Sequence, residues 1–225
     1  MTTLLNEGKS IIVIEGNIGT GKSTLINNIK NYITKYIENI ENKIEFNCEP
    51  LDEWNILLNN FYENPKRWAF TFQIKILLYH VKLLDNFNSN KKKIILLERF
   101  FLSSVKIFSQ ILLNNNNLND SEFEIINDLY EHILLKISNY NINIIYIYLK
   151  TDPNICLQRI IKRNRICEKN INIDYLNQLN NLYDKNFINN SIIIDNNLDK
   201  SMGGKKSPHE FNIPQSIINI LNKLI

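Results

Sequence analysis

A glycine-rich stretch near the start of the chain has the residue types and spacing of a phosphate-binding loop. Residues 16–24 read GNIGTGKST and match the pattern G-x-x-x-x-G-K-[ST]. The glycines allow backbone N–H groups to curve around phosphate oxygens, and the start of the following helix adds positive potential. In such loops the lysine reaches the terminal phosphates and the serine ligates magnesium. The stretch therefore predicts a nucleoside triphosphate site formed by Gly16, Asn17, Ile18, Gly19, Thr20, Gly21, Lys22, Ser23 and Thr24.

Two carboxylates follow predicted strands elsewhere in the chain. Glu49 comes directly after IEFNC (44–48), and Glu98 ends IILLE (94–98) and precedes Arg99. Open parallel sheets bind ligands at the carboxyl ends of their strands, where one carboxylate can act as a base and another as a magnesium partner. Each alone can equally be a capping or solvated group. Burying the ionised Glu98 and Arg99 at the end of a strand costs free energy unless other groups pair with their charges.

A basic segment in the second half of the chain reads LQRIIKRNRICEK (157–169). Arg159 and Arg163 are four residues apart on one predicted helix face, and Arg165 follows closely. Like charges at this spacing destabilise a helix. The segment can be a solvated basic face, or a lid over about 159–170 that closes on phosphates and stabilises the charge of a transferring group.

The elements that position these residues alternate along the chain. Apolar runs at 10–15, 44–48, 94–98, 144–149 and 191–195 predict strands, and segments with helical spacing lie between them. This alternation predicts an α/β fold of the P-loop NTPase type, with three layers and about five parallel strands flanked by helices. We expect a single domain over residues 1–225, with loops at 114–120 and 196–208 and a final helix whose apolar stripe is Ile217, Ile220, Leu221 and Leu224. The strand order is not predicted.

Composition excludes several classes of protein. With 225 residues and 44% apolar content, the chain can bury a sizeable core, and a net charge of +3 gives no argument for nucleic-acid binding. No apolar run approaches the length of a membrane span. Three cysteines without metal-ligand spacing favour a reducing compartment. Because few residues precede the first strand, we expect no signal peptide and a cytoplasmic location.

Taken together, these segments resemble the deoxynucleoside kinases. EGNIGTGKST, CEPLDEW, ENPKRWAFTFQ, LER and RIIKRNR occur in the order and at the spacing of that family, from about Ile11 to Phe187. The resemblance implies transfer of the γ-phosphate of ATP, with Mg²⁺, to the 5′-hydroxyl of a deoxynucleoside. It also implies a helix-packed homodimer.

The resemblance assigns roles to individual residues. Glu49 is similar to the general base, Arg99 to the cation beside it, and Glu98 to a magnesium partner that joins Ser23. Arg159, Arg163 and Arg165 resemble lid arginines that act with Lys22. The residues that correspond to nucleoside contacts are Trp54, Phe72 and Phe108 around the base, Gln73 on the base edge, and Tyr62 and Glu168 at the sugar 3′-hydroxyl.

Gln73 also stands out without the resemblance. Gln73, Ile76 and His80 share one predicted helix face that is otherwise apolar. A Gln buried on that face is expected to have a hydrogen-bonding partner, and a nucleobase can supply one. The alternative is a Gln that faces water.

The chain departs from the family pattern at several positions. Phe100 replaces the usual serine, and Cys167 replaces an acid of the lid. Members that prefer deoxycytidine or purines carry an Arg and an Asp at the positions of His80 and Ser104. Their absence, with a branched Ile76, leaves room for a 5-methyl group and predicts a broad, pyrimidine-leaning substrate range that includes thymidine. His80 can instead face away from the pocket.

Alternative functions remain open from the sequence. A thymidylate-type monophosphate kinase would share the loop, sheet and lid, but would typically carry Asp-Arg at Glu98-Arg99. A regulatory GTP-binding module would need a guanine-recognition element, and Lys150-Thr151-Asp152 lacks its spacing. A non-catalytic NTP-binding protein is disfavoured because Lys22, Glu49, Arg99 and the lid arginines are all present.

Overall fold

The computed structural model describes residues 8–37, 40–165, 168–197 and 213–224. Cys167 and residues 198–212, which contain most of the expected 196–208 loop, lie outside the described residues. The expected loop at 114–120 is present between two helices, of which one ends at Asn114 and the next begins at Asp120.

Five parallel strands form the sheet, as predicted, in the order β2-β3-β1-β4-β5. Their bounds lie within one residue of the predicted runs: β1 Ser10–Glu15, β2 Ile44–Asn47, β3 Ile94–Glu98, β4 Asn143–Lys150 and β5 Ile192–Asp195. The central strand β1 is buried along its whole length because helices cover both of its faces. Its carboxyl end therefore lies in the middle of the ligand-binding edge.

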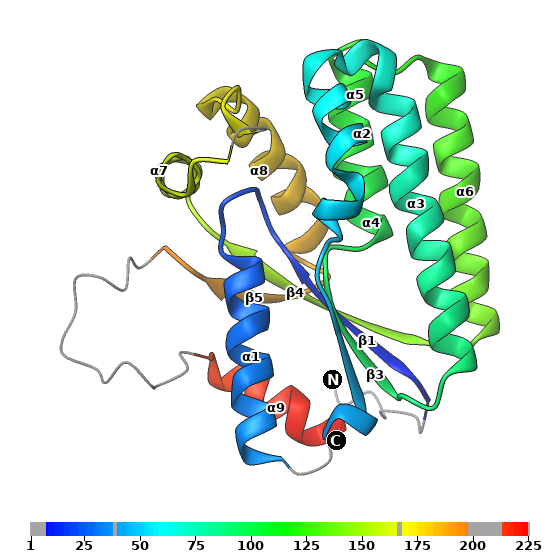
Figure 1. The fold of residues 1–225 in the computed structure, drawn as a ribbon, viewed down its shortest axis with the longest axis vertical. Coiled ribbons are helices and arrows are strands. Elements are labelled where there is room, and N and C mark those ends of the chain that lie inside the picture. Colours follow the sequence, from blue (N-terminus) through cyan, green and yellow to red (C-terminus); the bar gives the residue numbers. More distant parts are fainter. Residues whose placement is uncertain (1–7, 38–39, 166–167, 198–212, 225) are drawn as a thin grey trace.

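One face of the sheet packs against α1 (Lys22–Tyr36) and α9 (Gln215–Leu224). The helical segment predicted after the first apolar run is confirmed, and its residues Leu25, Ile29 and Ile33, spaced four apart, are buried in this layer. In the final helix, Ile217 and Leu221 are buried, and Ile220 and Leu224 pack against the same cluster. Figure 1 shows both helices below the phosphate loop on this side.

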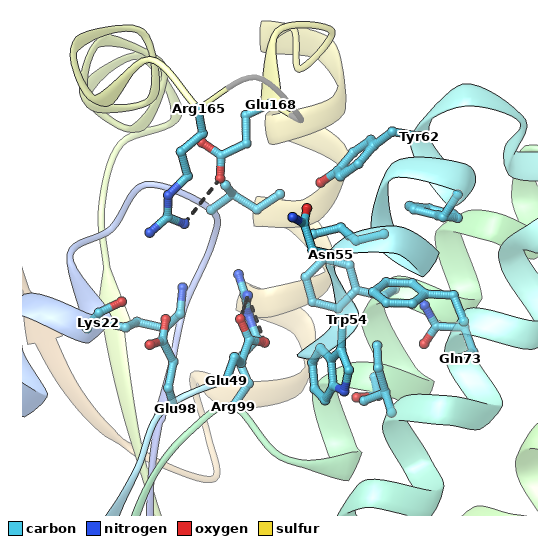
Figure 2. Close-up of a pocket in the computed structure, with 18 of the residues that line it drawn as sticks. Lys22, Glu49, Trp54, Asn55, Tyr62, Gln73, Glu98, Arg99, Arg165 and Glu168 are labelled. Atoms are coloured by element: carbon cyan, nitrogen blue, oxygen red, sulfur yellow. Dashed lines mark hydrogen bonds and ion pairs between the residues drawn. The ribbon is translucent and has the colours of Figure 1, made fainter. Parts of the chain in front are cut away.

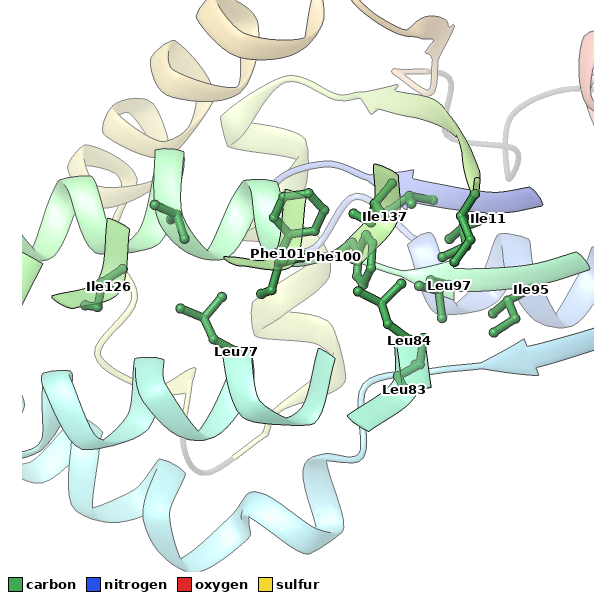
Figure 3. Close-up of a cluster of buried hydrophobic side chains, with 14 of the residues drawn as sticks. Ile11, Leu77, Leu83, Leu84, Ile95, Leu97, Phe100, Phe101, Ile126 and Ile137 are labelled. Atoms are coloured by element: carbon green, nitrogen blue, oxygen red, sulfur yellow. The ribbon is translucent and has the colours of Figure 1, made fainter. Parts of the chain in front are cut away.

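The opposite face carries a larger helical layer. It contains α3 (Pro65–Ser89), α4 (Phe101–Ser103), a π-helical turn η2 (Ser104–Ser109), α5 (Gln110–Asn114) and α6 (Asp120–Asn139). Figure 3 shows side chains of these helices meeting Ile11, Ile95 and Leu97 of the sheet in one buried cluster. Asn64 caps α3 by accepting from the Arg67 N–H, and Pro65 occupies its first turn.

The remaining elements frame the carboxyl edge of the sheet. After the short helix η1 (Ile40–Asn42) and strand β2, the chain enters α2 (Leu51–Glu63), which packs against α3. Across the edge, α7 (Pro153–Arg163) packs against α8 (Ile173–Phe187). Figure 1 shows α2 and α7–α8 on either side of the strand ends. The predicted three-layer architecture is confirmed.

None of the helices within the described residues is both long enough and apolar enough to cross a bilayer.

Candidate active site

A cavity of about 330 Å³ lies at the carboxyl ends of the strands. This volume falls in the range of small-molecule sites. Figure 2 shows Lys22 and Glu98 on one side, the Glu49–Arg99 pair in the middle, and Trp54 and Gln73 on the other side. The predicted residues that line the cavity are Ile18, Gly19, Lys22, Ser23, Glu49, Trp54, Tyr62, Phe72, Gln73, Ile76, His80, Glu98, Arg99, Ser104, Phe108, Arg163, Arg165 and Glu168.

The phosphate loop has the backbone that its glycines permit. Gly19 and Gly21 adopt φ values of 84° and 93°, which side-chain-bearing residues rarely adopt. A Cβ on Gly19 would also lie 2.6 Å from the carbonyl oxygen of Cys156 in α7. The loop is therefore tightly packed against α7.

Lys22 lies inside this loop. Its ammonium group is buried and donates to the carbonyl oxygens of Gly16 at 3.1 Å and Asn17 at 2.8 Å. Burial lowers its pKa to about 8, and the nearby Arg99 acts in the same direction. A cation in this environment gains most from an incoming phosphate.

Other loop residues shape the site without lining the cavity. Asn17 donates to the carbonyl of Leu176 at 2.9 Å and accepts the N–H of Ile18, which fixes the loop to α8. The Thr20 hydroxyl donates to the Asn17 carbonyl. Thr24 is exposed in the first turn of α1. The residues of the predicted loop that do not line the cavity are Gly16, Asn17, Thr20, Gly21 and Thr24.

Glu49 and Arg99 form the ion pair at the centre of the site. One guanidinium nitrogen, Nη1, donates to both carboxylate oxygens of Glu49 at 3.1 Å. Arg99 has a φ of 57°, and its N–H donates to the carbonyl of Ile14. Although burial opposes its charge, Glu49 raises the pKa of Arg99. The positive charge that directly follows β3 is thus paired.

Ser23 and Glu98 fit a magnesium ion by their chemistry. Both line the cavity beside Lys22, and they offer a hydroxyl and a carboxylate oxygen, the hard ligands that Mg²⁺ prefers. Among the described residues, no group of three or more His, Cys, Asp or Glu side chains is placed to hold a metal alone. A magnesium ion here would take its remaining ligands from phosphate and water.

The predicted lid arginines take different positions. Arg163 makes two hydrogen bonds to Glu168, at 2.6 Å and 2.5 Å, and Arg165 lies 3.7 Å from the same carboxylate. Arg159 instead donates to the carbonyls of Thr20 and Asn196 and does not line the cavity. Because the Glu168 carboxylate offsets the charge of Arg163, the expected repulsion between Arg159 and Arg163 is reduced.

The end of the cavity farthest from Lys22 is aromatic. Trp54 meets Phe72 edge-on with ring centroids 6.2 Å apart, and Phe61 stacks on Phe72 at 5.3 Å. Gln73 is 3% exposed, so the alternative of a water-facing Gln is wrong. Within the described residues, Gln73 Oε1 and Trp54 Nε1 are buried without a hydrogen-bond partner. Buried polar atoms of this kind are usually satisfied, which favours a ligand that supplies the partner.

His80 lines the same end of the cavity and is not turned away from it. It is buried, and its ring meets Phe100 edge-on with centroids 5.0 Å apart. Phe100 is itself fully buried, so the aromatic ring in place of the usual serine fills the space beside His80. Burial lowers the pKa of His80 to about 3, which keeps the ring neutral at physiological pH.

Acid is expected to destabilise the protein through His80. The unfolded chain binds a proton below about pH 6.5 while the native ring stays neutral, so stability falls as the pH drops from 6.5 towards 3. This linkage should remove roughly 2 kcal/mol of the unfolding free energy between pH 7 and pH 5. Urea unfolding of wild type and His80→Leu at both pH values measures it. The matched control is His132→Leu, because His132 is exposed on α6. Equal pH dependence in wild type and His80→Leu would contradict the prediction.

Five cavity-lining residues were not predicted from the sequence: Asn55, Leu58, Phe61, Leu112 and Tyr175. A partial signal existed in α2, where Trp54, Leu58 and Phe61 follow helical spacing. That helix is apolar around much of its circumference, so the spacing alone did not show which face meets the cavity. Tyr175 comes from α8, just after the predicted lid segment, and its residue type alone did not mark it as a cavity residue.

The sequence is similar to known kinases. A family model described as deoxynucleoside kinase matches residues 12–219. A probable deoxycytidine kinase of fowlpox virus is 37% identical over 211 residues, which cover 92% of this chain and 77% of the relative. Deoxycytidine kinase 2 of Gallus gallus is 30% identical over 194 residues (75% and 70%). Human mitochondrial thymidine kinase 2 is 28% identical over 193 residues (83% and 67%).

Proposed function

Because this chain belongs to the deoxynucleoside kinase family, we propose that its cavity accepts a pyrimidine deoxynucleoside, thymidine included, for phosphorylation at the 5′-hydroxyl. The chain is a deoxynucleoside kinase, and the family implies ATP as the phosphate donor. One observation carries the proposal for the site. The Glu49–Arg99 pair lies in a single cavity between the lysine of the phosphate loop and an aromatic end with an unpartnered Gln73 oxygen.

The geometry supports a direct role for Glu49 in proton transfer. A carboxylate between the base-binding end and the phosphate loop is placed to take the proton of the 5′-hydroxyl as that oxygen attacks the γ-phosphate. Arg99 holds both oxygens of Glu49, which restricts its rotation.

Positive charge for the transferred phosphoryl group comes from several elements. We assign this role to Lys22, Arg163 and Arg165, which line the cavity. Arg159 would join them only by leaving the carbonyls of Thr20 and Asn196. Ser23 and Glu98 would hold a magnesium ion, which when bound neutralises phosphate charge.

Acceptor recognition falls to the remaining residues. We assign Tyr62 and Glu168 to the sugar 3′-hydroxyl, and Trp54, Phe72 and Phe108 to the faces of the base. Gln73 offers an acceptor and a donor to the base edge. Ile76, His80 and Ser104 bring no charged side chain to the cavity. This favours a pyrimidine with either an amino or a keto group, in line with relatives named for deoxycytidine and thymidine.

A substrate panel tests the proposed function. The purified protein is incubated with ATP, Mg²⁺ and each of the four deoxynucleosides, with thymidylate as a fifth acceptor. We expect rapid phosphorylation of thymidine, comparable or slower phosphorylation of deoxycytidine, and none of thymidylate. Turnover of purine deoxynucleosides alone would contradict the pyrimidine preference. Turnover of thymidylate alone would replace the proposal with a monophosphate kinase.

The assembly and the location of the protein are also proposals. We propose that residues 1–225 act as one kinase domain that forms a cytoplasmic homodimer and binds no nucleic acid. Exposed aliphatic residues on α3 and α6 support the dimer: Leu78, Ile125 and Leu135. The free thiols of Cys48 and Cys156 suit a reducing compartment. Sedimentation equilibrium decides between dimer and monomer.

A further inference from the structure

A buried acid lies beneath the site and has no part in the mechanism above. Glu15 is the last residue of β1 and is fully buried. Its carboxylate accepts the N–H of Phe100 at 3.1 Å and the hydroxyl of Tyr183 at 3.5 Å. A buried carboxyl group is costly unless donors satisfy it. Phe100 directly follows Arg99 in the chain, and Tyr183 contacts the side chain of Arg99.

Tyr183, in α8, connects the acid to the guanidinium group. Its hydroxyl donates to Glu15 and accepts the Nε–H of Arg99 at 3.3 Å. The other end of the same guanidinium group donates to Glu49. Hydrogen bonds therefore run without a break from Glu15 through Tyr183 and Arg99 to Glu49. They join β1, α8, the end of β3 and the segment after β2.

Arg99 needs such restraint because its backbone is strained. A φ of 57° is uncommon for a residue with a long side chain, because it brings the Cβ close to the backbone. The backbone is pinned on both sides, since the Arg99 N–H donates to Ile14 and the following N–H of Phe100 donates to Glu15. Tyr183 then fixes the orientation of the guanidinium group through Nε. Glu15 therefore restrains the backbone next to Arg99, and Tyr183 restrains its side chain.

We propose that Glu15 and Tyr183 are positioning residues for phosphoryl transfer, which hold Arg99 against Glu49 without touching the substrate. The proposal rests on the roles given above to Glu49 and Arg99. Burial raises the pKa of Glu15 to about 7, while Arg99 lowers it. Arg99 thus favours the charged form of the acid that restrains it.

The test uses two tyrosines that pack face to face. Tyr183→Phe keeps the ring and removes the hydroxyl that contacts Arg99 and Glu15. Tyr148→Phe is the matched control. Its ring lies parallel to that of Tyr183 with centroids 5.8 Å apart, and its hydroxyl donates to Asp184 instead. We expect Tyr183→Phe to lower kcat about tenfold with the KM for ATP unchanged, and Tyr148→Phe to stay within about twofold of wild type.

A double-mutant cycle separates positioning from a general structural role. In Arg99→Lys, a single ammonium cannot reach Glu49 and Tyr183 as the guanidinium group does. If Tyr183 acts through Arg99, adding Tyr183→Phe to Arg99→Lys should change kcat by less than about twofold. Glu15→Gln, which keeps an acceptor for the Phe100 N–H, should behave like Tyr183→Phe. Circular dichroism and thermal melting report whether each variant is folded.

The assays distinguish a failure of the positioning role from a failure of the proposed function. Wild type and Glu49→Gln are assayed beside the other variants, so nucleoside phosphorylation and its dependence on Glu49 are measured separately. If Tyr183→Phe matches Tyr148→Phe while wild type phosphorylates deoxynucleosides, the positioning role is overturned and the function stands. A full tenfold loss on top of Arg99→Lys would also overturn it, because the effect would not pass through Arg99.

Discussion

Glutamine in place of Glu49 is expected to lower kcat by about 10²–10⁴-fold, the usual contribution of a general base. The amide has the shape of the carboxylate and still offers an oxygen to Arg99, but it cannot take the proton of the attacking hydroxyl. It also removes the negative charge that faces the guanidinium group at 3.1 Å. The KM for ATP should change little, because Glu49 lies beside the phosphate loop and is not part of it.

Initial rates at saturating thymidine and ATP measure this loss. Glu53→Gln is the matched control, since Glu53 is exposed in the first turn of α2 and does not line the cavity. Its kcat should equal that of wild type. A Glu49→Gln enzyme with more than about a third of wild-type kcat would show that another group takes the proton.

Local patterns predicted the sheet and the phosphate loop well. The five strands lie within a residue of their apolar runs. The reason is clearest for β1 and β3, which are buried along almost their whole length and so are continuous apolar segments. The phosphate-binding pattern needs consecutive residues only, so one stretch was enough to predict the loop, although its contacts with α7 and α8 were not predicted. Strand order depends on which helices pack together across the sheet, and no local pattern carried that information.

The site was predicted only where chemistry is visible in a residue type. Glu49 and Arg99 could be singled out because they lie in CEPLDEW and LER, two of the segments that carry the family resemblance. Glu15 and Tyr183 could not be singled out from the sequence. They are 168 positions apart in the chain, and their role depends on the contact that the fold makes between them. The separate acceptors of Arg159 and Arg163 likewise depend on Thr20, Asn196 and Glu168, which helical spacing does not reveal.

Methionine in place of Lys22 should abolish most activity and yet stabilise the fold. The ammonium group is buried and its pKa falls from 10.5 to about 8. Because the unfolded chain binds this proton more tightly, folding with the charge in place costs up to roughly 3 kcal/mol at pH 7. An apolar side chain of similar length avoids that cost. It also deprives the terminal phosphates of their cation, which should reduce kcat/KM for ATP by about 10³-fold.

Two measurements on the same Lys22→Met protein test both halves of this prediction. Thermal unfolding without nucleotide should give a higher Tm than wild type, and the kinase assay should give almost no product. Lys35→Met is the control, because Lys35 is exposed in the last turn of α1 and its replacement should change neither the Tm nor the kinase activity.

A lower Tm for Lys22→Met would mean that the hydrogen bonds to Gly16 and Asn17 outweigh the desolvation of the charge. Unchanged kcat/KM would mean that the loop does not bind the phosphates through Lys22. A stabler but inactive variant would identify Lys22 as a residue retained for catalysis at the expense of the fold.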